Sequence, residues 1–112
     1  MPQFKDRERG FEAKFAHDEE MKFRAQSRRN KLLGLWAAEL MGLGSAEAES
    51  YAREVIKADF EEAGDEDVFR KLRGDLDAKN VQVSDQEIRS QIEKKLAEAK
   101  AQLLEESETR EE

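Results

Sequence analysis

The sequence predicts an all-α protein: a four-helix bundle preceded by a mobile N-terminal arm and followed by a frayed acidic tail. Apolar residues recur at steps of three and four along four segments, and no segment has the alternation typical of a strand. Helix-start residues and glycines separate these segments. Charged residues make up 42% of the 112 residues, so the core must be thin and built from helices with one apolar face.

The expected arm covers residues 1–17 and leads into a four-helix domain at residues 18–104. We expect Asp18 to cap the first helix, whose charged beginning should project or pack only partly. Its second half is the main core helix, with Trp36 as the obvious anchor, and it ends at the glycines Gly42 and Gly44. The apolar face of this half consists of Leu32, Leu33, Leu35, Trp36, Leu40 and Met41.

Two shorter helices are expected next, and their short connections favour antiparallel neighbours. The second helix should be capped by Ser45 and closed by Gly64. The third should be capped by Asp65 and end between Gly74 and Asn80. Their apolar faces consist of Ala48, Tyr51, Ala52, Val55, Ile56, Phe60 and Ala63 in the second helix, and Val68, Phe69, Leu72 and Leu76 in the third.

The fourth helix has the sharpest start signal of the chain. Ser84 and Glu87 form a capping box, flanked by Val83 and Ile88 as a hydrophobic staple. Residues 105–112 have nothing to bury, so we expect a frayed, disordered tail. The apolar stripe of this helix consists of Ile88, Ile92, Leu96, Ala99 and Leu103.

Charge is divided unevenly along the chain. Residues 1–31 hold nine Lys and Arg against six Asp and Glu, whereas residues 32–112 hold eleven against twenty-one. The net charge of −7 argues against nucleic acid and anionic lipid as partners, because both are bound through basic surface. The longest apolar run, residues 32–43, falls short of the ~20 residues that span a bilayer. These features indicate a protein partner.

Three runs of sequence resemble the zeta subunit family of α-proteobacterial F-type ATP synthases. They are FEAKFAHDEEM at residues 11–21, RRNKLLGLWAAE at 28–39 and KADFEEAGDEDVFRK at 57–71. The resemblance covers roughly residues 4–104. It implies a non-catalytic inhibitor subunit with four helices. In such a protein the N-terminal segment enters a catalytic α/β interface beside the rotor γ subunit and stops ATP hydrolysis. It also implies a cytoplasmic protein, peripheral to the inner membrane through the synthase.

The arm has a composition that suits this role. Three phenylalanines would share one face if the arm became helical, and Gly10 favours an arm that orders only on its partner. Such a pattern is typical of a helix that binds in a groove. The same rings would also fit a position packed back onto the bundle. The candidate partner-binding residues are Phe4, Arg7, Arg9, Phe11, Lys14 and Phe15.

Other motifs indicate no catalytic chemistry. His17 and Glu20 would share one helical face, but a single pair does not make a metal site. Capping by Asp18, with Glu19 and Glu20 in the positive first turn of the helix, is the better interpretation, and we expect no cofactor. The basic run from Arg28 to Lys31 is short and lacks interleaved aromatic residues, so a solvated helix face is the better interpretation. No phosphate-binding loop and no acid–base pair are present. The alternative function is a non-enzymatic helical adaptor that acts through its exposed charged helix.

Overall fold

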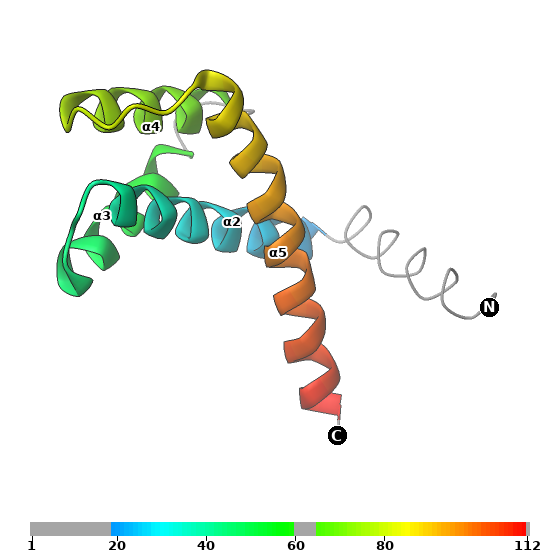
Figure 1. Cartoon of the computed structure of the whole chain (residues 1–112). Helices are drawn as coiled ribbons and strands as arrows, with labels where there is room; N and C mark the ends of the chain where they lie inside the picture. Colours follow the sequence, from blue (N-terminus) through cyan, green and yellow to red (C-terminus); the bar gives the residue numbers. More distant parts are fainter. Residues whose placement is uncertain (1–18, 60–64, 112) are drawn as a thin grey trace.

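The computed structural model describes residues 19–59 and 65–111, with side chains described as far as residue 106. In these ranges the chain is helical and contains no strand, which confirms the all-α class and the four-helix arrangement (Figure 1). The expected arm and the expected cap Asp18 lie outside the described residues. The helices are α2 (Glu19–Leu40), α3 (Ser45–Ala58), α4 (Glu66–Ala78) and α5 (Asp85–Glu111).

Helices α2 and α3 form a close hairpin. A Cβ added at Gly34 would lie only 2.5 Å from Ala52 Cα, so the two backbones meet at this point. The turn begins as expected at Gly42, whose φ of 73° is the left-handed conformation that glycine adopts readily. The Gly42 amide donates to the Glu39 carbonyl and the Leu43 amide to the Ala38 carbonyl, which ends α2 in a Schellman motif.

The start of α3 and the start of α4 lack the side-chain caps that we expected. Gly44 occupies the cap position of α3, and Ser45 is the first helical residue. Asp65 does occupy the cap position of α4, but its carboxylate caps no amide of this helix. The expected end of α4 is confirmed at Asn80, which has a φ of 59° and closes a second Schellman motif.

Helix α5 starts where the capping box placed it. The Glu87 amide donates to Ser84 Oγ at 3.0 Å, while the Glu87 carboxylate accepts from Gln91 instead of reaching back. The helix crosses α2 and continues beyond it (Figure 1). It runs to Glu111, past Leu104, where we expected the chain to fray.

The apolar core has two parts. The main core contains buried residues of all four helices, among them Leu33, Val55, Leu72 and Ile88 at 0% exposure. Trp36, the expected anchor of this helix, is only partly buried and packs against the border of this cluster. A smaller cluster contains Ala25 and Leu103 as buried residues, with Met21 and Leu96 packed against them.

Candidate functional site

The six candidate partner-binding residues all lie outside the described residues and stay a prediction. They are Phe4, Arg7, Arg9, Phe11, Lys14 and Phe15. What the structure does describe is the segment that follows them in the chain. We call Glu19–Asn30, the first half of α2, the stem, and we call residues 96–106 of α5 the distal segment.

The stem packs on the distal segment through the smaller apolar cluster. Ala25 is 2% exposed and Leu103 is 8% exposed, although few apolar residues are available in either segment. The acidic first turn of the stem is confirmed, since Glu19 and Glu20 lie at its positively polarised end. The stem is therefore held against the body rather than projecting from it.

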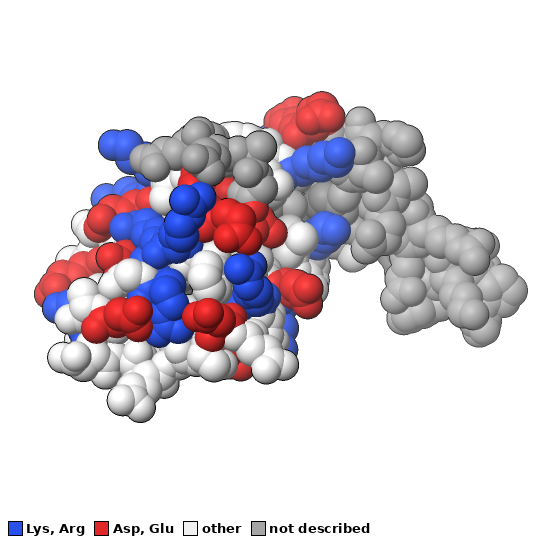
Figure 2. Space-filling model, turned by 90° about the horizontal axis from the view of Figure 1, so that it is seen from above, with Lys and Arg blue, Asp and Glu red and all other residues white. Residues whose placement is uncertain are grey.

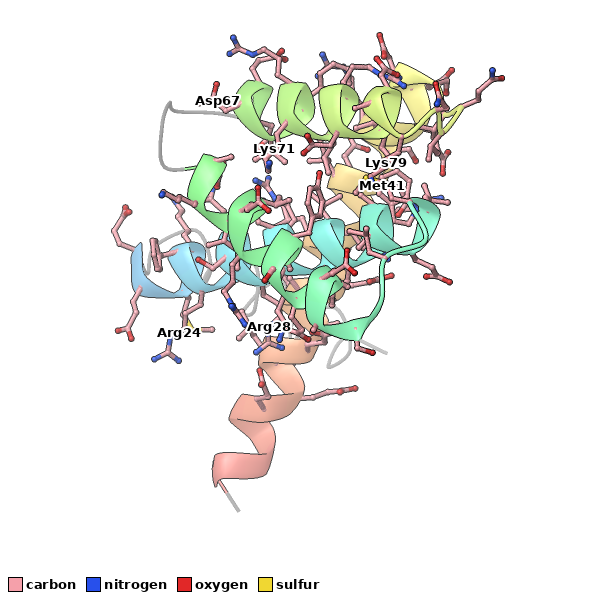
Figure 3. All side chains as sticks on the ribbon, turned by 90° about the vertical axis from the view of Figure 1, so that its left-hand side faces the viewer. Arg24, Arg28, Met41, Asp67, Lys71 and Lys79 are labelled. Carbon is pink, nitrogen blue, oxygen red and sulfur yellow. The ribbon has the colours of Figure 1, made fainter. Side chains whose placement is uncertain are left out.

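Arg28 adds polar contacts between the same two segments. Its Nη1 donates to Gln102 Oε1 at 2.9 Å, and its Nη2 donates to both carboxylate oxygens of Glu106 at 3.0 and 3.1 Å. Figure 3 shows Arg28 beside the ribbon of α5. Because the guanidinium fork engages two acceptors one helical turn apart, it fixes the position of α5 along α2.

The next two residues of the stem form a buried polar network. Arg29 is 2% exposed and Asn30 is 1% exposed, so the expected solvated face is wrong at these positions. Arg29 Nη1 donates to Asp65 Oδ1 at 2.7 Å, and Arg29 Nε donates to Asn30 Oδ1 at 3.0 Å. Asn30 Nδ2 donates in turn to Asp59 Oδ2 at 2.8 Å.

This network joins α2 to the chain on both sides of residues 60–64. Asp59 is the C-cap residue of α3 and Asp65 is the N-cap residue of α4. Arg29 Nη2 makes no hydrogen bond to a described residue, but it lies 3.6 Å from Asp59 Oδ2 and faces a compensating charge. A buried guanidinium without a neighbouring carboxylate would strongly destabilise the fold, so Arg29 depends on both Asp59 and Asp65.

A second polar cluster joins α3 to α4. The Tyr51 hydroxyl donates to Asp75 Oδ2 at 2.8 Å, and Lys71 Nζ lies 3.0 Å from the same oxygen and 5.1 Å from the centre of the Tyr51 ring. Figure 3 shows Lys71 directed from α4 toward α3. Burial, and then the hydrogen bond to Asp75, raise the pKa of Tyr51 well above its ordinary value. The protonated phenol is therefore favoured in the folded protein.

The surface of the described residues carries charges of both signs close together. Figure 2, which looks down on α4, shows Lys and Arg interleaved with Asp and Glu. An open hollow of about 570 Å³ is lined mainly by charged residues of both signs, and another of about 550 Å³ is lined mainly by uncharged residues of the turn between α4 and α5. In the described part of the chain, no group of three His, Cys, Asp or Glu side chains is placed to hold a metal ion. None of the described helices is long and apolar enough to cross a membrane.

Comparison with known proteins identifies a family and a solved structure with a similar fold. A family model described as ATPase inhibitor subunit zeta matches residues 1–102, so the match includes the expected arm. A protein structure solved by solution NMR shares 56% sequence identity with the chain, with a TM-score of 0.70. That similarity covers 77% of this chain and 98% of the other. No curated protein matches the sequence.

Proposed function

The chain belongs to the ATPase inhibitor subunit zeta family, and from this membership we propose that it blocks ATP hydrolysis through its N-terminal arm. The arm, residues 1–17, would enter a catalytic α/β interface of an F-type ATP synthase near the rotor. The observation that carries the proposal is the family match, because it begins at residue 1 and thus includes the arm as well as the helical body.

The composition of the arm supports an apolar contact with a charged border. Phe11 and Phe15 are one helical turn apart, and Phe4 would share their face. Burying one phenylalanine contributes roughly 1.5–3 kcal/mol, so two such rings would strengthen binding by about a hundredfold or more. Arg7, Arg9 and Lys14 would orient the arm on acidic partner surface and act mainly on the association rate.

The body supports the proposal because it has a core of its own. Among the described residues, the main core is formed by buried side chains between Leu33 and Ile92 that come from all four helices. A body bound to the enzyme would keep the arm at high effective concentration near its groove. The protein would then act as a non-enzymatic subunit in contact with the α, β and γ subunits of the catalytic sector.

The test measures ATP hydrolysis by the soluble catalytic sector of the cognate synthase. We expect the full-length protein to inhibit hydrolysis and a chain that lacks residues 1–17 to fold without inhibiting. The double variant Phe11→Ala, Phe15→Ala should reach half-maximal inhibition only at about a hundredfold higher protein concentration. Leu40→Ala is the matched control, since Leu40 is a 43% exposed apolar side chain at the opposite end of α2 from the arm.

Undiminished inhibition by the arm-deleted chain would place the inhibitory surface on the bundle and refute the mechanism. The alternative function, a helical adaptor, predicts no inhibition by the full-length protein at stoichiometric amounts. Circular dichroism and thermal melting of each variant separate a lost contact from a lost fold, because the helical signal and its cooperative loss report on the body.

A further inference from the structure

The stem is the part of the body that connects directly to the arm, and its helical state is not secured by the main core. The main core includes no residue of α2 before Leu33. The stem continues the packed second half of α2, but most helical stability in proteins comes from tertiary packing rather than from helix propensity. Contacts outside the main core must therefore keep the stem helical.

The described contacts of the stem divide between its two ends. Its last two residues, Arg29 and Asn30, are held by the buried network with Asp59 and Asp65. The earlier turns, through Met21, Ala25 and Arg28, pack on the distal segment of α5 instead. These contacts are the smaller apolar cluster and the hydrogen bonds from Arg28.

We propose that the distal segment of α5 keeps the stem helical by packing along it. The arm would then extend from a rigid helix in a fixed direction. This inference rests on the proposed function. If the stem frayed, its residues would form a flexible connection between the body and the arm. A longer flexible connection lowers the effective concentration of the arm at its groove, so inhibition would weaken although every arm residue remained. Leu103 and Arg28 are then positioning residues.

The test compares two substitutions in the distal segment that introduce the same side chain. Leu103→Glu places a carboxylate at the buried contact with the stem, whereas Ala101→Glu changes an exposed position of the same helix. In the free protein, we expect Leu103→Glu to speed hydrogen exchange of amides 21–28 by about tenfold or more. Exchange in α4 should stay unchanged, and Ala101→Glu should alter neither region.

A gentler pair of variants serves if Leu103→Glu unfolds the body. Arg28→Ala removes the hydrogen bonds to Gln102 and Glu106, whereas Arg24→Ala removes only the pair with Glu20 within α2. Because Arg28 is 30% exposed, we expect a change in stem exchange of at most about fivefold, larger than that for Arg24→Ala.

Hydrolysis assays then connect the stem to inhibition. If the stem amides of Leu103→Glu exchange at nearly the rate of an unstructured chain, we expect its potency to fall by about twofold or more, because effective concentration decreases as the flexible connection lengthens. Unchanged hydrogen exchange of the stem in both Leu103→Glu and Arg28→Ala would overturn the proposal that the distal segment keeps the stem helical. This holds whether or not these variants inhibit ATP hydrolysis. Stem exchange at the rate of an unstructured chain together with full potency would overturn the role of the stem in presenting the arm. Failure of the proposed function is a different result, namely inhibition by the chain that lacks residues 1–17.

Discussion

The crossing of α2 and α3 at Gly34 makes a sharp prediction about stability. A Cβ at position 34 would lie 2.5 Å from Ala52 Cα, 3.1 Å from Ala52 Cβ and 3.2 Å from Ala52 N. Two of these atoms belong to the backbone of α3, so no side-chain rotation relieves the overlap. Gly34→Ala therefore requires the two helices to separate, and the buried residues around the crossing lose contact with one another.

The expected loss follows from two opposing effects. Overpacking of a close contact costs roughly 1–3 kcal/mol, whereas alanine is favoured over glycine in a helix by about 1 kcal/mol. Since the overlap involves backbone, we expect a cost at the upper end of its range and a net destabilisation of about 2 kcal/mol. In a domain of this size, such a loss lowers the melting temperature by roughly 8–16 °C.

Gly74→Ala is the matched control for this measurement. Gly74 also lies inside a helix, but an added Cβ there meets no atom within 4 Å. This variant should therefore stabilise the protein by about 1 kcal/mol. Urea denaturation and thermal melting of the two variants should give shifts of opposite sign. A stabilisation by Gly34→Ala equal to that by Gly74→Ala would refute the close approach of α2 and α3.

Two further predictions concern buried rings and side chains of the body. Leu72→Ala should lower the free energy of unfolding by about 2–5 kcal/mol, and by more than Trp36→Ala, because Leu72 is fully buried whereas Trp36 is only partly buried. Urea denaturation measures both losses, and equal losses would contradict this order. Above the ordinary tyrosine pKa of 10.0, the Tyr51 phenol should be deprotonated in the unfolded chain but still protonated in the folded protein. The free energy of unfolding should therefore fall as the pH rises above that value. Tyr51→Phe should remove that part of the loss, as measured by melting temperature against pH, and an unchanged pH dependence would show that other groups cause it.

Most of the fold follows from local patterns in the sequence. The apolar stripe of α5 is confirmed, with Ile88, Ile92, Ala99 and Leu103 buried. Apolar residues at helical spacing lie on one face of a helix, and that face is stable only when it packs on other helices. The ends of α2 and α4 are confirmed for a related reason, since Gly42 and Asn80 tolerate the left-handed backbone that a Schellman motif needs. Both signals act within a few residues of the chain and need no knowledge of the tertiary structure.

The buried network could not be predicted in the same way. Arg29 lies in a basic run that resembles a solvated face, and its partners Asp59 and Asp65 are distant in the sequence. Local charge patterning therefore favours exposure, whereas the tertiary structure brings two carboxylates to the guanidinium and makes burial possible. Asp65 illustrates the competition, because its carboxylate accepts from Arg29 and leaves the first turn of α4 without a side-chain cap.

The placement of Trp36 follows from the close approach of α2 and α3. Gly34, Ala37 and Ala38 share the buried face of α2 with Leu33, and the close backbone contact at Gly34 leaves no room for an indole ring at that point. The large side chain is consequently displaced to the border of the main core. Ring size alone identified Trp36 as an anchor, but the small residues beside it decide which face of α2 is buried. In a helix that packs this closely, the row of small residues is therefore the better guide to the core.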